Sequence, residues 1–304
     1  MRILLLGGSG QLGQEFLSNK TANNYKVFSP SSSELDISNF SKVKKFISNL
    51  KPDLVLNFAA YTDVDAAENN FSDCLRINFE SIKNIINLLN KLNIPLIHIS
   101  TDYVFGRYQE GPYDLCDKVG AVNNYGISKL KAEEEIIKFS KKAIIIRTAS
   151  LYGKYGNNFA KTFLSLLVKE KKINVVSDQN ISITWSKDII NAIFSLLNLI
   201  NKSNEWKKEE GTEIIHLVNK GYTTWYNIAL NFAEFLHKLD EKDKIYSVEP
   251  ILAKNWKIKT PRPTDSRLVF CGNIPLLGNV DMPEWNKSLN EALPLIMERN
   301  YNVG

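Results

Sequence analysis

Cysteine is scarce in this sequence. Only three occur in 304 residues, Cys74, Cys116 and Cys271, and their spacing matches no metal-binding motif. An odd and widely spaced set also excludes the disulfide framework on which small secreted domains depend. We therefore expect three structural or incidental thiols, no metal site, and a location in the reducing cytoplasm.

Long apolar runs are also missing. After Met1 and Arg2 only four apolar residues precede the first glycine, which is too short for the apolar region of a secretory signal. No apolar stretch reaches the roughly 20 residues that a membrane-spanning helix needs. The sequence therefore predicts neither a secretory signal nor a membrane partner.

The excess of positive charge is small and is spread along the chain. The formal net charge is +5, the lysines mostly alternate with glutamates, and no basic stripe stands out. A nucleic-acid partner is therefore not expected. The 44% hydrophobic and 23% charged residues are typical of a soluble globular protein, and 304 residues fit one large or two ordinary domains.

A glycine motif is present near the amino end. A short apolar strand is expected over residues 2–6, and GGSGQLG follows at 7–13. Its glycines allow a tight turn and a close backbone approach, and the helix that begins there offers N–H groups to a pyrophosphate. A glycine pattern alone is often only a loop, but its place between a first strand and a helix favours a dinucleotide cofactor.

Strands and helices then alternate along the first half. Buried strands are expected at 25–28, 53–58, 94–99 and 143–147, and helices at 39–50, 75–92 and from about 123. This alternation is typical of an α/β fold with a doubly wound, parallel, Rossmann-type sheet. Ala59 and Ala60 end one of these strands, where they either let a cofactor lie against the backbone or pack under a helix.

The second half is less regular. Helices are expected near 158–169, 187–199, 225–239 and 288–299, short strands near 173–176 and 213–218, and a solvated loop at 201–211. We therefore expect a dinucleotide-binding domain over 1–150, rejoined by parts of 173–205, and a smaller carboxyl-terminal α/β substrate domain over 151–304.

Three polar residues in the middle of the chain form a candidate catalytic set. Tyr125 and Lys129 are four apart at the start of an expected helix and so share a face. A nearby ammonium lowers the pKa of a phenol from about 10, which makes it a usable acid or base. Thr101, at the end of the preceding strand, is placed to hold a carbonyl oxygen beside that phenol. Tyrosine and lysine at this spacing are usually a solvated helix face, and the glycine motif is what favours the catalytic interpretation.

Four segments carry a resemblance to a known family. They are the glycine motif with Gln11 and Leu12, NFAAYTDVDAAE at 57–68, STDYVF at 100–105, and Tyr125 with Lys129. Together they are similar to the extended short-chain dehydrogenase/reductases, and among these to the dTDP-4-dehydrorhamnose reductase family. Further likeness at 147–148, 156–162, 178–179, 223–226 and 262–268 extends the resemblance over nearly the whole chain.

The resemblance implies NAD(P)H-dependent reduction of the C4 keto group of a nucleotide-activated 4-keto-6-deoxy sugar. Among such sugars, the resemblance implies dTDP-4-dehydro-L-rhamnose as the substrate and dTDP-L-rhamnose as the product, for surface polysaccharide synthesis. Tyr125 would be the proton donor, Lys129 would tune it and contact a ribose, and Thr101 would influence the tyrosine. The implied cofactor-binding residues are Gly7, Gly10, Gln11, Leu12, Gly13, Asp36, Ile37, Ala60, Tyr61 and Thr62, together with Tyr125 and Lys129. The implied substrate-binding residues are Thr101, Asp102, Tyr103, Ser150 and Arg262.

Two departures from the family lie in the expected sugar pocket. Many members carry Ser-Trp-Val-Tyr where this chain has Ala149-Ser150-Leu151-Tyr152, so Ser150 stands in place of an indole. The segment at 181–184 reads ISIT where relatives often have GAPT. Two interpretations of Trp185 are open: it leans into the pocket and restores part of the wall, or it is a core residue of the following helix.

The cofactor preference follows from the end of the second strand. That strand runs into SPSSS at 29–33, with no acid before Glu34 to bind the adenosine ribose and repel a 2′-phosphate. We therefore expect NADPH to be accepted at least as well as NADH.

Two alternative activities are a nucleotide-sugar epimerase or dehydratase, which retains its cofactor, and a non-catalytic binding or regulatory subunit. The chain is expected to be a monomer or a homodimer.

Overall fold

A parallel sheet of six strands lies at the centre of the fold. The computed structural model describes residues 1–203, 210–239, 245–256, 260–275 and 277–301. In order across the sheet the strands are β10 (Gly211–His216), β5 (Lys142–Thr148), β4 (Leu96–Thr101), β3 (Leu54–Asn57), β1 (Arg2–Leu6) and β2 (Lys26–Phe28), all paired in parallel. The predicted Rossmann-type sheet is confirmed. Its switch point lies between β1 and β3, because the chain passes from β1 to β2 and returns on the other side as β3.

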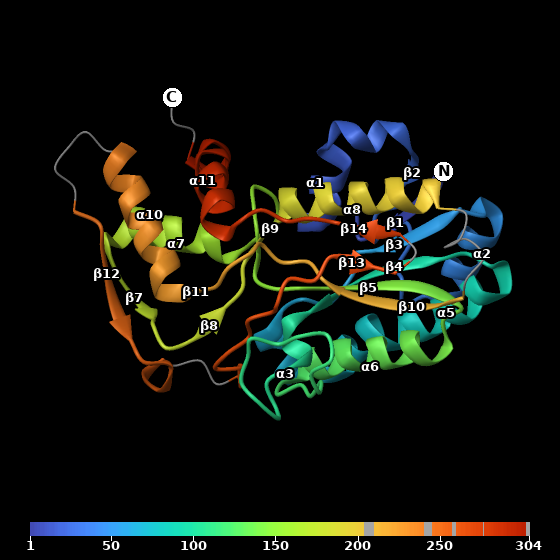
Figure 1. Ribbon diagram of the computed structural model, residues 1–304, viewed down its shortest axis with the longest axis horizontal. Coiled ribbons are helices and arrows are strands. Elements are labelled where there is room, and N and C mark those ends of the chain that lie inside the picture. Colours follow the sequence, from blue (N-terminus) through green and yellow to red (C-terminus); the bar gives the residue numbers. More distant parts are fainter. Residues whose placement is uncertain (204–209, 240–244, 257–259, 276, 302–304) are drawn as a thin grey trace.

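Helices cover both faces of this sheet (Figure 1). Side chains alternate along each strand, so Ile3 and Leu5 of β1 belong to one core and Leu4 and Leu6 to the other. On the first face lie α1 (Gln11–Ser18) and α8 (Ser186–Lys202), and on the second α2 (Phe40–Leu50), α5 (Ser81–Leu92) and α6 (Asn124–Phe139).

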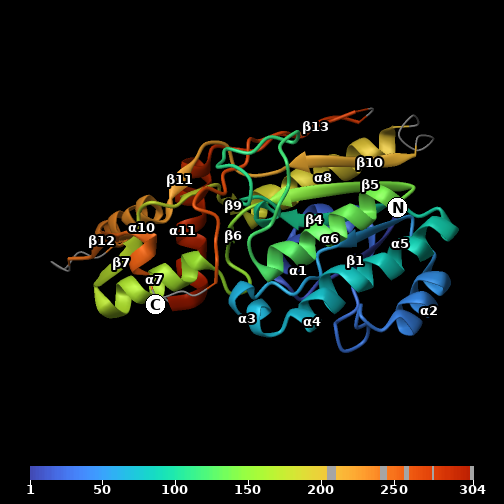
Figure 2. The ribbon, with the colours of Figure 1, turned by 90° about the horizontal axis from the view of Figure 1, so that it is seen from below.

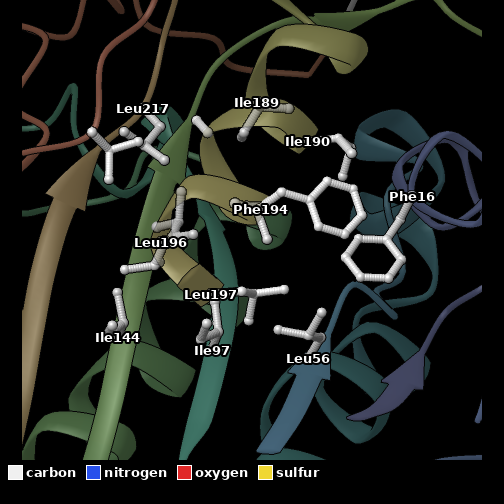
Figure 3. Packing of buried hydrophobic residues seen from close by; sticks show 14 of the residues in the cluster. Phe16, Leu56, Ile97, Ile144, Ile189, Ile190, Phe194, Leu196, Leu197 and Leu217 are labelled. Atoms are coloured by element: carbon white, nitrogen blue, oxygen red, sulfur yellow. The ribbon is translucent and has the colours of Figure 1, made fainter. Parts of the chain in front are cut away.

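Helix α8 and strand β10 bring the chain back to the sheet after it has left it at β5. Phe194 of α8 stacks on Phe16 of α1 with ring centroids 4.5 Å apart, and Leu197 reaches over the strands in the same cluster (Figure 3). The strand expected at 213–218 is β10, which pairs with β5 at the edge of the sheet. Among the described residues no helix is long and apolar enough to cross a membrane.

The segment before α5 departs from the helix expected at 75–92. The short helices α3 (Val64–Asn69) and α4 (Phe71–Leu75) lead into a π-helical turn at Arg76–Glu80, and α5 begins only at Ser81. Within the turn Asn78 binds the backbone of Tyr61: its Oδ1 accepts from the N–H at 2.7 Å and its Nδ2 donates to the carbonyl at 3.0 Å. Apolar periodicity does not reveal such a turn, because the contact that accompanies it is made by a polar side chain, that of Asn78.

A second lobe lies beyond the carboxyl ends of the strands (Figures 1 and 2). It contains α7 (Phe159–Glu170), α10 (Trp225–Leu239) and α11 (Trp285–Tyr301), with β7 (Lys172–Val176) paired in parallel to β12 (Ser247–Ile251). The short strands are β6 (Leu151–Tyr152), β8 (Asn180–Ile181), β9 (Thr184–Trp185), β11 (Thr223–Thr224), β13 (Asn273–Ile274) and β14 (Gly278–Asn279). The helices expected here are confirmed with small shifts at their ends. Most of the loop expected at 201–211 falls on residues 204–209, outside the described residues.

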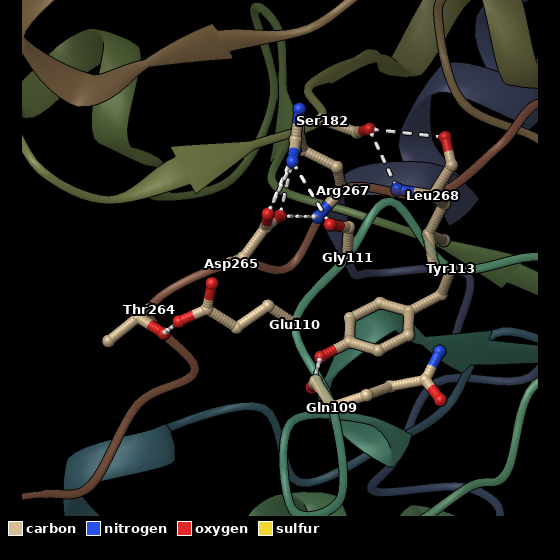
Figure 4. Close-up of polar contacts among 9 residues, drawn as sticks. All are labelled: Gln109, Glu110, Gly111, Tyr113, Ser182, Thr264, Asp265, Arg267 and Leu268. Carbon is tan, nitrogen blue, oxygen red and sulfur yellow. Dashed lines mark hydrogen bonds and ion pairs between the residues drawn. The ribbon is translucent and has the colours of Figure 1, made fainter.

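A polar cluster ties the loop at 109–113 to the loop at 264–268 (Figure 4). Arg267 pairs with Asp265 at 2.5 Å and donates to the carbonyl of Gly111 at 3.0 Å. The backbone N–H of Tyr113 donates to the carbonyl of Arg267 at 2.7 Å. The cluster fixes the loop at 260–268, whose first arginine borders the site described next.

Candidate active site

A cavity of about 820 Å³ opens at the carboxyl ends of β1, β3, β4 and β5. Ligands of open α/β sheets bind at this place, outside the switch point. The residues expected in the site that line the cavity are Gly7, Gly10, Gln11, Leu12, Asp36, Ile37, Ala60, Thr62, Thr101, Asp102, Tyr103, Tyr125, Lys129, Ser150 and Arg262. Two other expected residues, Gly13 and Tyr61, do not line it.

The glycine turn forms the wall of the cavity beside β1. Gly7 has a φ of +84°, and a Cβ there would lie 2.4 Å from the backbone nitrogen of Ala59. A Cβ on Gly13 would lie 2.3 Å from the carbonyl oxygen of Gly7, so Gly13 packs within the turn. Gly10 is the N-cap of α1, whose unpaired N–H groups suit a phosphate. The buried Nε2 of Gln11 has no hydrogen-bond partner among the described residues, which leaves a donor for a ligand.

The end of the cavity near β2 has one carboxylate in its wall, that of Asp36, while Glu34 does not line it. The carboxylate of Glu34 accepts from the N–H of Ser31 at 2.7 Å and from its hydroxyl at 2.8 Å, so it serves its own loop. Asp36 does line the cavity, and hydrogen bonds from Ser38 lower the pKa of its carboxyl. Pro30 and the uncharged Ser32 complete this end of the wall.

Helix α6 carries Tyr125 and Lys129 into the wall of the cavity, and both side chains border it as expected. Asn123 caps the helix, with its Oδ1 accepting from the N–H of Gly126 at 2.8 Å. A Cβ on Gly126 would lie 2.3 Å from the carbonyl oxygen of Tyr103, so the helix start packs directly on the turn after β4. This close packing brings the phenol of α6 to the end of β4.

The amine of Lys129 is held by groups of β4. Its Nζ donates to the carbonyl of Ile99 at 2.6 Å and lies 3.0 Å from Nε2 of His98, so it is directed at β4. Burial lowers the pKa of Lys129 to about 8. Burial also raises the pKa of the Tyr125 phenol, against a hydrogen bond with Thr101 that lowers it. The phenol is therefore protonated at neutral pH, which is the form that a proton donor requires.

Thr101 and Asp102 lie beside this phenol. The hydroxyl of Thr101 donates to Oδ1 of Asp102 at 2.9 Å. Burial raises the pKa of the Asp102 carboxyl to about 6, although hydrogen bonds with Ser266 and Thr101 lower it. Its Oδ2 is buried with no hydrogen-bond partner within the described ranges. The aspartate therefore offers a free acceptor at the cavity wall.

The opposite end of the cavity is bordered by Ser150 and by residues of the second lobe. Ser150 follows β5 with a φ of +40°. Gly156, Asn157 and Trp225 also line the cavity, with Gly156 against Gln11. The indole of Trp225, the first residue of α10, meets the ring of Phe159 edge-on with centroids 5.0 Å apart. This packing holds an aromatic side chain at the far wall.

Arg262 closes the cavity from the braced loop. Its Nη2 lies 3.1 Å from both carboxylate oxygens of Asp65, at the start of α3. Its Nε is buried with no partner in the part of the chain that the structure describes. The guanidinium therefore keeps one N–H for a ligand while its charge is partly balanced.

Comparison with known proteins identifies the family. Residues 1–297 match the RmlD substrate binding domain family. The chain belongs to this family. It is 30% identical over 289 residues to a dTDP-4-dehydrorhamnose reductase of Aggregatibacter actinomycetemcomitans, which covers 95% of this chain and 97% of that protein.

Two further members of the comparison bear on the site. A probable dTDP-4,6-dihydroxy-2-methyloxan-3-one 4-ketoreductase of Streptomyces antibioticus is 30% identical over 305 residues, covering 99% of this chain and 97% of that protein. The crystal structure of a dTDP-4-dehydrorhamnose reductase from Bacillus anthracis in complex with NADP has a TM-score of 0.84 and 29% identity. It covers 96% of this chain and 98% of the other.

Trp185 is a core residue, and the idea that it restores the wall of the RmlD-family sugar pocket is wrong. It is only 3% exposed, belongs to the core of the second lobe and does not line the cavity. Trp225 takes the position at the wall instead. Its signal in the sequence was TTW at 223–225, a tryptophan at the start of a helix where its face is not covered by the next turn.

Sequence reasoning also missed a buried polar line behind Lys129. His98 lies in β4 and Asn57 ends β3, and both are 1% exposed. Their side chains meet at 3.0 Å between Nδ2 of Asn57 and Nδ1 of His98. The signal was a histidine inside the apolar run PLIHIS, because a polar residue in a buried strand needs a partner.

Proposed function

We propose that this chain is an NADPH-dependent reductase that converts dTDP-4-dehydro-L-rhamnose to dTDP-L-rhamnose, for surface polysaccharide synthesis. The observation that carries the proposal is the protonated phenol of Tyr125 in a cavity that also contains the glycine turn. The names of the RmlD-family relatives support the same reaction.

The residues of the cavity fit a dinucleotide. Gly7 and Gly13 sit where any Cβ would collide with backbone, and the N-terminus of α1 and the unpaired Nε2 of Gln11 supply donors for a pyrophosphate. Ser32, Asp36 and Ile37 would border the adenosine end. Bound NADPH would supply the hydride for C4 of the sugar. The related Bacillus anthracis reductase holds NADP.

Tyr125 is the proton donor in this proposal. Its Oη gives a proton to the oxygen at C4 of the sugar as the keto group becomes a hydroxyl. Thr101 orients the phenol, because its own hydrogen goes to Asp102, one lone pair accepts from the N–H of Tyr103, and the other remains for the tyrosine at 125. Lys129 supports the phenol and contacts a ribose. Asp102 offers its free Oδ2 to a sugar hydroxyl.

The nucleotide-sugar lies between the lobes in this proposal. Trp225 covers the apolar face of the ring, and Ser150 adds a hydroxyl donor and acceptor. Arg262 directs its free Nε at the diphosphate, for which a guanidinium is well suited. Residues 1–150 with parts of 173–205 then form the cofactor domain, and 151–304 mainly the substrate domain.

A second substrate is favoured by one specific observation. Ser150 leaves more room than the indole that many family members carry, and the Streptomyces relative is named for another dTDP-linked ketone. The candidate is therefore reduction of a different dTDP-4-keto-6-deoxy sugar by the same residues.

We place the reaction in the cytoplasm, with the chain acting as a monomer or a homodimer. The three cysteines are free thiols, as a reducing compartment allows. Size-exclusion chromatography with light scattering would determine the oligomeric state.

The test is an assay of NADPH oxidation across a panel of dTDP- and UDP-linked 4-keto-6-deoxy sugars. One NADPH consumed per dTDP-L-rhamnose formed, with the product configuration determined by NMR, is the expected result. Turnover with only trace NADPH would instead indicate an epimerase or dehydratase. No turnover with any ketone would favour a non-catalytic subunit.

A further inference from the structure

Asn57, His98 and Lys129 form a line of hydrogen-bonding groups behind the cavity wall. The amide Nδ2 of Asn57 lies 3.0 Å from Nδ1 of His98, and Nε2 of the same ring lies 3.0 Å from Nζ of Lys129. All three side chains are at most 2% exposed. Because all three are buried, they are expected to satisfy their hydrogen bonds mainly with protein groups.

The orientation of the Asn57 amide is fixed at one end. Its Oδ1 accepts from the backbone N–H of Ala59 at 3.2 Å, and a backbone N–H can only donate. The NH₂ group of the amide therefore faces the histidine. Since that group is also only a donor, Nδ1 of His98 must be the acceptor and cannot carry a proton.

The imidazole of His98 is then held in one tautomer. Burial, together with the neighbouring Lys129, lowers the pKa of His98 well below its usual value, so the ring is neutral. A neutral ring that accepts at Nδ1 carries its proton on Nε2. That N–H points at Nζ of Lys129 and needs a lone pair there. A neutral amine has one, whereas an ammonium has three protons and no acceptor.

The rest of the amine is satisfied in the same state. Lys129 Nζ donates to the carbonyl of Ile99 at 2.6 Å. If Lys129 is charged instead, His98 must move its proton to Nδ1, where it meets the NH₂ of Asn57 donor against donor. Charging the lysine therefore costs the hydrogen bond between Asn57 and His98.

We propose that Asn57 and His98 are positioning residues that couple the charge of Lys129 to the tautomer of His98 and favour the neutral amine in the cofactor-free protein. The proposal deepens the proposed function, because Lys129 there supports Tyr125. Its first test needs neither cofactor nor substrate, so a failed reductase assay leaves that test intact.

Among the other titratable groups that face Lys129, those that change its pKa raise it, against the burial that lowers it. Tyr125 and Glu133 lie on its own helix, and Cys74 faces it from α4; the charges of Glu133 and Cys74 favour the ammonium. Glu133 is itself paired with Arg147 of β5 at 2.7 Å, which offsets part of its charge. From β4, the titratable group that faces Lys129 is His98, at 3.0 Å.

The direct test is ¹⁵N NMR of histidine-labelled, cofactor-free protein at pH 9, above the pKa of Lys129. The chain has three histidines, and the other two provide internal references. Nδ1 of His216 faces the carbonyl of Val269 at 3.2 Å, and Nε2 of His237 accepts from the N–H of Tyr246 at 2.7 Å, so both carry their proton on Nδ1. His98 should be the single Nε2–H tautomer, assigned by its loss in His98→Gln. Three Nδ1–H tautomers would overturn the proposal.

The second test uses an isosteric substitution that should reverse the tautomer of His98. In Asn57→Asp the carboxylate still accepts from Ala59 and now accepts from Nδ1–H, so His98 should become the Nδ1–H tautomer. The pKa of Lys129, followed by the pH at which the His98 signals shift, should rise by about one unit or more, the equivalent of one hydrogen bond. In Asn57→Ala, used if the aspartate variant does not fold, a mixture of tautomers is expected. An unchanged Nε2–H tautomer in the variant that folds would contradict the coupling.

A kinetic readout separates positioning from a general structural effect. Because a charged Lys129 stabilises the phenolate, Asn57→Asp should shift the basic limb of the kcat profile to lower pH, with the KM for NADPH changed less than twofold. An unshifted profile with a uniformly lower kcat would mean that Asn57 only supports the fold.

Discussion

The hydroxyl of Thr101 gives its hydrogen to the carboxylate of Asp102, 2.9 Å away, and accepts from the N–H of Tyr103, so one lone pair is left for Tyr125. At the end of β4, Thr101 therefore faces the phenol and its neighbour Asp102 faces the cavity. The Asp102 carboxyl is buried in this position, and burying its charged form lowers the free energy of unfolding.

The first prediction concerns that loss of stability. The pKa of Asp102 is raised from 3.8 to about 6, so the folded protein holds this proton more tightly than the unfolded chain does. Its contribution to stability is present below about pH 4 and is lost as the pH rises through 6. By linkage, Asp102→Asn should stabilise the protein by up to about 3 kcal/mol at pH 8 and by little at pH 4. Urea unfolding at both pH values measures this, and equal differences at the two would contradict it.

The second prediction concerns the proton donor. Tyr125→Phe removes only the hydroxyl, so kcat should fall by ~10²–10⁴, the usual contribution of a general acid. Cofactor binding, measured by fluorescence titration, should remain nearly unchanged. A variant that keeps most of its kcat would remove Tyr125 from the mechanism. Since burial raises the pKa of this phenol, the wild-type kcat for reduction should not fall between pH 6 and about 8.

The third prediction distinguishes the tryptophans. Trp225→Ala removes an apolar face from the cavity and should raise the KM for the nucleotide-sugar at least several-fold, with little effect on the KM for NADPH. Trp185→Ala should instead destabilise the protein by about 3–5 kcal/mol, because it empties a core position. Trp256, 45% exposed, provides the matched control whose replacement by alanine changes neither quantity. A sugar KM unmoved in well-folded Trp225→Ala would place the sugar elsewhere.

The fourth prediction concerns the cofactor. Because Glu34, the first acid after β2, binds Ser31 of its own loop, kcat/KM for NADPH should at least equal that for NADH. Ser32→Asp adds a negative charge to the adenosine end of the cavity wall and should lower kcat/KM for NADPH about tenfold while NADH is much less affected. A tenfold preference of the wild type for NADH would show that Asp36 repels the 2′-phosphate.

Much of the fold followed from local signals. Apolar runs and helical periodicity placed the strands, and the glycine turn after β1 marked the switch point where the cavity lies. The spacing of Tyr125 and Lys129 was enough to place both at its wall. These features depend on short stretches of chain, whose geometry is set by their own residues.

What the sequence could not show depends on contacts between distant segments. The spacing of Lys129 from Tyr125 did not show that the lysine nitrogen is bound by Ile99 and His98 of a strand about 30 residues earlier in the chain. Trp185 lies nearer in sequence to the altered pocket segment, yet tertiary packing buries it and brings Trp225 to the cavity. Neither outcome is encoded in periodicity.

The most direct test of the proposed reduction is to follow deuterium from NADPH into the sugar product. NADPH carrying deuterium at the transferable position of its nicotinamide is incubated with the enzyme and dTDP-4-dehydro-L-rhamnose, and the sugar product is examined by NMR. One deuterium at C4 of dTDP-L-rhamnose is expected for each NADPH oxidised, with the hydroxyl proton drawn from Tyr125 and solvent. Product that carries no deuterium, or label that stays in an unconsumed cofactor, would contradict the proposed reduction.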